Sequence, residues 1–416
     1  MQMSNMKRIL SWSSGLGLLI LAGCNNDTTQ KMELKEDTSN VKGSYAYDLA
    51  FLRQYTKGVL ELTSEDSTAK LLLSPEWQGR VMTSTARGDS GTSFGWINYD
   101  LVSSGEKRKQ FNPIGGEERF WIGPEGGQYS FYFKQGDSFN ISTWQVPAFI
   151  DTIAYDVVES NRSQAIFSAR TTINNYSGNA FDIAVERKIS LLRKEDLANQ
   201  LGIAIDNNIH CVAYETVNKI TNAGAADWTK QNGLVSIWLL GMFTPTPQTV
   251  VMIPFHPAPD ARSFITDDYF GSIPQERLQI KDSILYFTCD GKYRSKIGLS
   301  PMVAKPIAAS YDFAKNVLTL VLPEVHKNAP YVNSKWENQK EPYEGDVINS
   351  YNDGPLADGS QLGPFYEIES SSPAMELKKG MSGSYRQVTC HLQADYAILK
   401  QFVQDLLTID LDEVTR

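Results

Sequence analysis

The sequence predicts an all-β protein built as one large antiparallel sandwich with a helix at its C-terminus. From about residue 45 the chain alternates between short apolar-polar runs and breaks rich in Gly, Asn, Asp and Pro, which is typical of strands and turns. Almost no helical stretch separates these runs, although a parallel α/β sheet would require helices there. Near the C-terminus, over residues 395–411, apolar residues recur at helical spacing and predict a helix that packs on the sheet.

The N-terminus has the pattern of a targeting segment. Two basic residues precede an apolar stretch that ends in "LAGC", and small residues before such a cysteine resemble a bacterial lipobox. The sequence predicts a lipoprotein signal peptide over 1–23, a lipid on Cys24, a flexible tether over 24–44 and one domain over 45–416. The expected location is the bacterial cell envelope, where the lipid anchors the protein to a membrane. An ordinary signal peptide that contains a cysteine is the alternative.

Charge and motif content exclude several function classes. The chain of 416 residues has a formal net charge of −9, which argues against a nucleic-acid partner because phosphates attract Lys and Arg. The stretch "GPEGGQ" lacks the Gly-Lys-Ser/Thr ending of a phosphate-binding loop. No two histidines have the spacing of a zinc site. We therefore expect no cofactor and no metal, and a neutral ligand such as a sugar remains compatible with the composition.

The predicted elements follow one another along the whole domain. Short helices are expected over 46–55 and 193–202. In "FDIAVERKISLL" the residues Phe181, Ile183 and Val185 fall on one face, as in a half-buried strand. The stretch 327–363 is the longest without a predicted strand, and a loop of that length is expected to cover a site. Strands are predicted within the runs 57–65, 69–76, 128–134, 165–173, 181–192, 233–243, 283–289 and 316–324.

The stretch "GGEERFWIGPEGG" at 115–127 combines carboxylates, an arginine and a tryptophan. Strand alternation places Glu117, Arg119 and Trp121 on one face, and Glu125 follows in the turn. Carboxylates and arginine bind hydroxyl groups, and a tryptophan face covers the apolar side of a sugar ring, so this face is a candidate sugar platform. A solvated ion pair beside a packed tryptophan is the alternative interpretation.

Several segments, taken in order, resemble the galactose mutarotase-like (aldose 1-epimerase) superfamily. "LLLSPEWQGRVMTSTARG" resembles its first hairpin, and "GGEERFWIGPEGG" is similar to a Gly-Gly, Arg, Trp, Pro-Glu hairpin of the superfamily. "FDIAVERKISL", "VNKITNAG" and "GPFYEIESSSPAMELKKGMSGSYRQVTCHL" resemble its middle and closing strands. The overall layout also resembles a lipoprotein family of Bacteroidetes-type bacteria without assigned activity. The resemblance covers roughly residues 45–392 and implies a β-supersandwich with a sugar-sized groove.

The resemblance also implies site residues. In the epimerases a glutamate of the closing strands removes the anomeric proton and a histidine protonates the ring oxygen. Glu369 stands where that glutamate would be, and Glu367 shares its face by alternation. The chain departs from the pattern at "TNAGAADW", where Ala223 replaces the histidine of a Thr-Asn-His motif. His256 or His326 would then have to supply the acid from a loop, and neither matches the motif.

Two further stretches carry charged or polar side chains at suggestive spacing. "RSKIGLSP" places Arg294 and Lys296 on one strand face, as sugar-binding cations or as a solvated face. "YEGDVINSYNDGP" around Asp346 is rich in oxygen ligands that suit calcium, but its spacing is not that of an EF-hand, and Asx turns explain it as well.

The sequence therefore predicts a carbohydrate-binding lipoprotein, with or without acid–base chemistry at Glu369. A non-catalytic glycan-binding or structural envelope protein is the second reading, favoured by the missing histidine. A glycoside hydrolase or lyase is the third, and it requires two carboxylates facing each other across the groove, for which Glu125 and Glu369 are the candidates.

Overall fold

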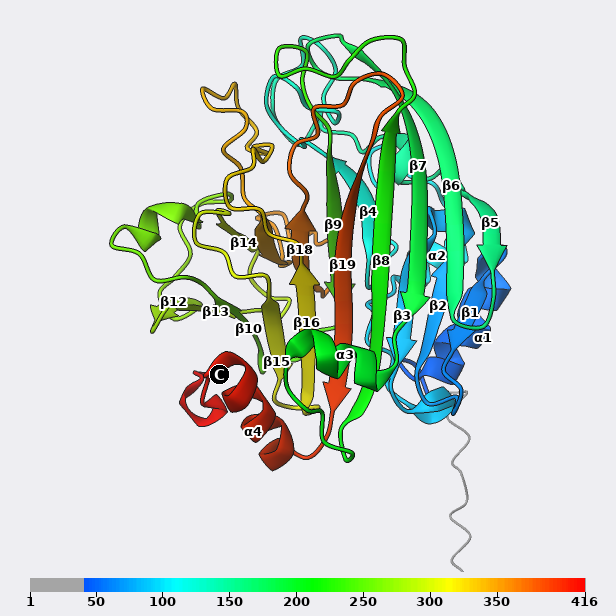
Figure 1. Cartoon of the computed structure of the whole chain (residues 1–416), viewed down its shortest axis with the longest axis vertical. Helices are drawn as coiled ribbons and strands as arrows, with labels where there is room; N and C mark the ends of the chain where they lie inside the picture. The colour runs from blue at the N-terminus through cyan, green and yellow to red at the C-terminus, as the bar shows by residue number, and fades with distance from the viewer. Residues whose placement is uncertain (1–40, 416) are drawn as a thin grey trace, which may run out of the picture. The chain divides into compact units, whose positions relative to one another are not determined.

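A computed structural model describes residues 41–415 of the chain, and three antiparallel sheets dominate this region (Figure 1). The predicted signal peptide, Cys24 and all of the tether up to residue 40 lie outside the described residues. Within the described region, no helix is long and apolar enough to cross a membrane.

The largest sheet has ten strands, in the order β12-β13-β10-β15-β16-β19-β8-β7-β6-β5. Its centre is formed by long strands that lie side by side in Figure 1, because β19 and β8 pair over twelve residues and β7 pairs with both β8 and β6. The ten strands are β5 (Asp156–Ser160), β6 (Gln164–Asn174), β7 (Ala180–Leu191), β8 (His210–Asn222), β10 (Thr249–Pro254), β12 (Leu278–Lys281), β13 (Ile284–Thr288), β15 (Ala308–Asp312), β16 (Val317–Pro323) and β19 (Ser382–Gln393).

A six-stranded sheet packs against the inner face of the ten-stranded sheet, and its order is β11-β14-β17-β18-β9-β4. Apolar side chains of the two sheets share the core, for example Phe120 with Phe167 and Ile368 with Val321. We call the opposite side of the six-stranded sheet its outer face. The six strands are β4 (Arg119–Gly123), β9 (Ser236–Phe243), β11 (Ile265–Thr266), β14 (Ser295–Leu299), β17 (Ile348–Asn352) and β18 (Tyr366–Ser371).

Helices and a small sheet complete the described region. The predicted C-terminal helix is present as α4 (Tyr396–Leu407), and with α3 (Lys194–Leu201) it packs on the outer side of the ten-stranded sheet, where Leu399 and Phe402 are buried. Helices α1 (Tyr45–Tyr55) and α2 (Tyr99–Ser104) pack with a three-stranded sheet of β1 (Leu60–Thr63), β2 (Lys70–Ser74) and β3 (Arg80–Thr85). The predicted all-β sandwich with a C-terminal helix is therefore confirmed.

Three local predictions were wrong. Residues 128–134 form turns instead of a strand, because Phe131, Tyr132 and Phe133 are all buried and do not alternate between two faces. The segment 327–363 is interrupted by β17. The stretch 115–127 is not a hairpin, because β4 is a single edge strand that pairs with β9, more than a hundred residues away.

Candidate functional site

The outer face of the six-stranded sheet collects charged residues from three separate parts of the chain. The strand register pairs Arg119 with Leu240, Leu240 with Glu369, Glu367 with Tyr351, and Tyr351 with Lys296. Directly paired residues of antiparallel strands share a face, so these side chains lie on one surface. With Glu125 from the loop after β4, we call Arg119, Glu125, Lys296, Glu367 and Glu369 the outer cluster.

One buried ion pair of the outer cluster joins β4 to β18. The Arg119 guanidinium donates from Nη2 to Oε1 of Glu367, and both side chains are almost completely buried. The same guanidinium lies 4.8 Å from the centre of the Trp121 ring. The predicted common face of Arg119 and Trp121 is therefore confirmed, and so is that of Glu367 and Glu369.

The second buried pair joins β14 to β18. Lys296 donates from Nζ to Oε2 of Glu369 at 2.8 Å, and Trp238 of β9 donates from its indole to the same oxygen at 3.0 Å. The ammonium also lies 5.0 Å from the Trp238 ring centre. Burial acts to lower the pKa of Lys296, but the carboxylates of Glu369 and Glu125 outweigh it, so the pKa is raised and the lysine stays charged.

Loops with aromatic side chains cover the outer cluster. Trp144 donates from Nε1 to Oε1 of Glu125 at 3.0 Å, and its ring stacks at 5.9 Å on Trp336, which also hydrogen-bonds with Glu125. Trp144 and Trp336 are only partly buried. The cover therefore consists of two loops instead of a third sheet.

Burial gives two carboxyl groups of this cluster raised pKa values. Burial raises the pKa of Glu125 to about 7, Lys296 opposes the shift, and the negative charge of Glu369 adds to it. Burial also raises the pKa of Glu367, against the opposing effect of Arg119. A carboxyl group with a pKa near neutrality is suited to both giving and taking a proton at pH 7.

Several buried polar atoms of this face have no hydrogen-bond partner within residues 41–415. They are Nε and Nη1 of Arg119, Nε1 of Trp121 and Oε1 of Glu369. Arg119 and Trp121 belong to β4 and Glu369 belongs to β18, and β9 lies between these two strands. Buried polar groups without a partner cost free energy, about 1–3 kcal/mol each. The outer face thus presents both unused donors and an unused acceptor.

Glu117 was wrongly predicted to share the face of Arg119 and Trp121. Its carboxylate points to the ten-stranded sheet, where it accepts from the Ser84 hydroxyl at 2.9 Å and lies 3.1 Å from Nε2 of His391. Gly115 and Gly116 both have positive φ angles and approach the backbone and side chains of β3 and Trp96 closely. Glu117 itself lies in a bend and Glu118 bridges to Val81 of β3, whereas β4 begins only at Arg119, so the strand alternation does not extend back to Glu117.

Glu118 lies beside Glu117 in what we call the inner cluster, formed by Ser84, Glu117, Glu118, Arg187, Thr216, Gln387 and His391 between the sheets. Arg187 donates to Oε1 of Glu118 at 3.0 Å, and Thr216 and Gln387 both donate to Oε2 at 3.0 Å. Burial raises the pKa of Glu118 against the effect of Arg187. Every carboxylate oxygen of Glu117 and Glu118 therefore has at least one partner.

The two candidate histidines lie on exposed loops. His256 follows β10 and His326 follows β16, and no contact joins either imidazole to the outer cluster in the described part of the chain. Arg294 lies closer, because it donates from Nε to the Tyr351 hydroxyl at 3.3 Å, and Tyr351 pairs with Glu367 in the sheet. Its guanidinium is 3.8 Å from the centre of the Phe270 ring.

The Asp/Asn-rich segment does not converge on one point. Asp346 accepts from the Tyr269 hydroxyl at 2.6 Å, whereas Asp353 accepts from Tyr351. Burial raises the pKa of Asp346. Among residues 41–415, no three His, Cys, Asp or Glu side chains lie close enough together to hold a metal ion.

Sequence reasoning missed Trp144, Trp238 and Trp336 as neighbours of the site, and it gave Lys296 only as one of two alternatives on a strand face. Lys296 alternates with buried apolar residues, a pattern that also fits a solvated strand face. Its contact with Glu369 depends on the register of β14, β17 and β18, which no short motif encodes. The tryptophans at 144 and 336 lie on loops, where periodicity gives no signal.

A model of a family described as "Family of unknown function (DUF6786)" matches residues 43–416. No curated protein matches the sequence significantly.

The chain is similar to several solved structures. A protein from Escherichia coli K12 named as a suspected aldose 1-epimerase is 12% identical, with a TM-score of 0.47, over 80% of this chain and 98% of that one. A galactose mutarotase-like protein from Lactobacillus casei is 9% identical, with a TM-score of 0.45, over 81% and 100%. A galactose mutarotase related enzyme from Lactobacillus acidophilus is 10% identical, with a TM-score of 0.43, over 81% and 98%. At such identities no residue role passes from these proteins to this chain.

Proposed function

Because the chain belongs to this family of unknown function, we propose a function from its own geometry: it binds a carbohydrate at the outer cluster. The observation that carries this proposal is the set of buried atoms without partners on Arg119, Trp121 and Glu369. Two of these side chains have donors to offer and one has an acceptor. Each hydroxyl group of a sugar is both a donor and an acceptor, so one neutral ligand satisfies both kinds of atom.

Charged ligands fit this site less well than a neutral one. An anion would pair with Arg119 and Lys296 but would meet the carboxylates of Glu367 and Glu369. A cation would meet the same two basic residues. A polyhydroxy ligand avoids both repulsions, and the partly buried rings of Trp144 and Trp336 are the aromatic surfaces nearest to solvent at this cluster.

The experiment is a calorimetric titration of the purified protein with a panel of neutral mono- and oligosaccharides. Trp121→Phe removes a donor that has no partner among residues 41–415 while it keeps an aromatic ring. We expect the best saccharide to bind this variant about 10-fold more weakly, as expected for one lost hydrogen bond in a buried site. Exposed Asn338→Ala is the control. Equal binding by Trp121→Phe and the unmodified protein would contradict the proposal.

A second candidate function is proton transfer on the bound sugar. The observation that favours it is the pair Glu125 and Glu369, which interact with the same Lys296, while burial raises the pKa of Glu125 to about 7. Carboxyl groups whose environments differ in this way are suited to act as acid and base. In this proposal Glu369, which accepts from Lys296, takes the proton of the anomeric hydroxyl, and Glu125 takes the place of the histidine that is missing at Ala223.

Anomer exchange followed by NMR on the best ligand tests this chemistry. We expect Glu125→Gln and Glu369→Gln each to lower the exchange rate at least about 100-fold. Glu125→Gln keeps the size of the side chain, so binding measured in parallel separates lost chemistry from lost affinity. Binding without any exchange in the unmodified protein would leave a non-catalytic carbohydrate-binding protein. A product with a cleaved glycosidic bond would instead indicate a hydrolase or lyase that uses the same two carboxylates.

We also propose that the protein is anchored to the bacterial envelope by a lipid on Cys24, on the strength of the "LAGC" pattern after an apolar stretch. Mass spectrometry of the protein purified from membranes would detect the lipid on the N-terminal cysteine. We expect Cys24→Ser to remove the lipid and to move the protein from the membrane fraction to the soluble fraction. An unmodified Cys24 in a membrane-bound protein would rule the anchor out.

A further inference from the structure

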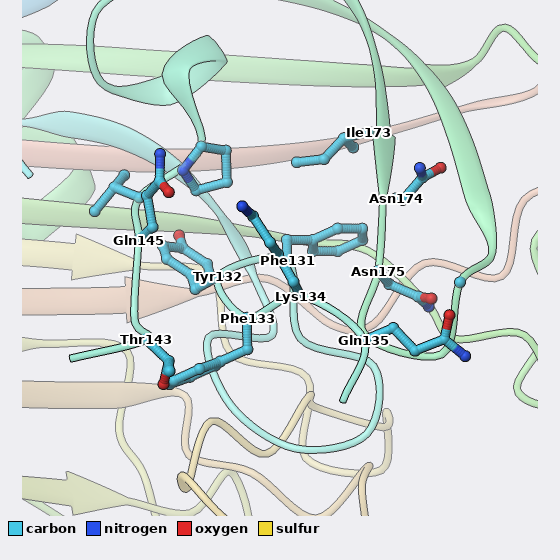
Figure 2. Close-up of a pocket in the computed structure, with 13 residues that line it drawn as sticks. Phe131, Tyr132, Phe133, Lys134, Gln135, Thr143, Gln145, Ile173, Asn174 and Asn175 are labelled. Atoms are coloured by element: carbon cyan, nitrogen blue, oxygen red, sulfur yellow. The ribbon is translucent and has the colours of Figure 1, made fainter. Parts of the chain in front are cut away.

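An open cavity lies beside the end of β6, separate from the residues of the outer cluster (Figure 2). Its volume is about 380 Å³, within the range of small-molecule sites. Three segments line it: residues 131–135, residues 143–147 and the turn between β6 and β7 that includes Asn175 and Gly178. We infer that this cavity is a second binding site of the protein, for a neutral saccharide unit.

The walls of the cavity combine an aromatic floor with a rim of amides. The floor includes Phe131, Tyr132 and Phe133, all of which are buried. Figure 2 shows Gln145 and Thr143 on one side of the space and Asn174, Asn175 and Gln135 on the other, with Lys134 between them. Amides offer donors and acceptors together, which matches a ligand whose hydroxyl groups do the same.

The rim amides are available to a ligand, because they make no hydrogen bonds within the described part of the chain. This holds for the side chains of Gln135, Gln145 and Asn174. Asn175 differs, because it is buried and holds the turn together: its amide donates to the Asn232 carbonyl at 2.8 Å and accepts from the Asn179 backbone at 3.0 Å. The turn is thus fixed by one asparagine and the neighbouring asparagine is left free.

The charge of the residues that line the cavity also favours a neutral ligand. Lys134 is the only charged side chain among the lining residues. A phosphate or carboxylate ligand would find one exposed lysine and no second cation, whereas strong anion sites use several donors with positive charge. A saccharide does not need the lysine charge.

The segment 131–147 lines the cavity and also covers the outer cluster. Tyr132 belongs to the cavity floor, and its ring lies parallel to that of Trp144 with centres 6.3 Å apart. Trp144 in turn donates to Glu125. A ligand in the cavity therefore contacts the back of the segment whose tryptophan closes the outer cluster, and fluorescence from Trp144 reports its arrival.

The test is a calorimetric and fluorescence titration with glucose, galactose, maltose and cellobiose. In the double variant Q145A/N174A the rim loses two amides that have no role in folding contacts, and we expect about 10-fold weaker binding at one of two sites. Asn338→Ala, which removes an exposed amide elsewhere, is the matched control. A higher salt concentration is expected to leave the affinity unchanged, because a neutral ligand makes no ion pair with Lys134.

Different variants test the two proposed binding sites, so a failure of this inference is distinguishable from a failure of the proposed function. If Trp121→Phe weakens saccharide binding and Q145A/N174A leaves it unchanged, the result supports the outer cluster and overturns the cavity site. The reverse result would support the cavity and remove the outer cluster. Binding that depends on Lys134 and disappears in salt would overturn the neutral ligand, and no saccharide binding at all would overturn both sites.

Discussion

Glu118 and Arg119 are neighbours in the chain, yet they belong to two buried charge clusters of different kinds. Glu118 enters the inner cluster, where it pairs with Arg187 between the two large sheets. Arg119 enters the outer cluster, where it pairs with Glu367 beneath loops. Both pairs lie in strongly buried positions. They differ in what surrounds them and in which polar atoms are satisfied.

The carboxylates show this difference most clearly. In the inner cluster all four carboxylate oxygens of Glu117 and Glu118 accept hydrogen bonds. In the outer cluster Oε1 of Glu369 has no partner within residues 41–415. Both arginines keep two unpartnered nitrogens, so the guanidinium groups do not separate the clusters. Carboxylates whose oxygens all accept hydrogen bonds indicate a structural role, whereas a carboxylate oxygen without a partner beneath loops indicates a place for a ligand.

The largest effect is expected from breaking the inner cluster. Glu118→Ala leaves Arg187 charged and unpaired in the core, and Thr216 and Gln387 lose their acceptor. We expect the free energy of unfolding to fall by about 3–5 kcal/mol, measured by denaturant unfolding. A loss below about 1 kcal/mol would mean that the inner cluster does not have the structural role assigned to it.

A smaller loss of stability is expected from Glu369→Gln in the outer cluster. Lys296 then loses its charged partner, but it keeps 11% of its side-chain surface exposed and lies in the field of Glu125. We expect a loss of about 1.5–3 kcal/mol in the same unfolding experiment, together with loss of saccharide binding. A variant that loses more stability than Glu118→Ala would reverse the assigned roles of the two clusters.

The sequence predicted most of the fold and part of the outer cluster, for one physical reason. Strand periodicity is local, so it correctly placed Glu367 with Glu369 and Arg119 with Trp121. It failed at Glu117, which lies in a bend between two glycines with positive φ and the start of β4. A glycine pair was visible in the sequence, but its backbone angles depend on the close approach of Trp96 and β3.

Long-range strand pairing produces the side-chain contacts that the sequence did not predict. Lys296 reaches Glu369 because β17 lies between β14 and β18 in register, and Arg187 reaches Glu118 across two sheets. The cavity at the end of β6 had no sequence signal, because its amides come from three segments with ordinary turn composition. The alternation of side chains along a strand determines the sheet face on which a residue lies, but the register between strands determines which side chain it contacts.

A pH series sharpens the comparison further, because Glu125 is a carboxyl group of raised pKa that is only partly buried, whereas Glu118 of the inner cluster is fully buried. Its pKa is raised from 4.5 to about 7 by burial, so the folded state holds this proton more tightly than the unfolded state. This contribution to stability is present below about pH 4.5 and is lost as the pH rises through about 7. We expect the stability of the unmodified protein relative to Glu125→Gln to fall by on the order of 1 kcal/mol across that window. Denaturant unfolding at a series of pH values measures it, and a pH-independent difference would place Glu125 in contact with water.

The smallest effect is expected at Glu186, the residue directly before Arg187. Glu186 faces the other side of β7 and pairs with Lys219 at 2.9 Å, with side chains 50% and 43% exposed. Exposed pairs of this kind contribute little because water screens both charges. We expect Glu186→Gln to change the free energy of unfolding by less than about 0.5 kcal/mol, compared directly with Glu118→Ala in the same titration. A cost like that of Glu118→Ala would show that position on β7, and not burial of the ion pair, governs the stability of this region.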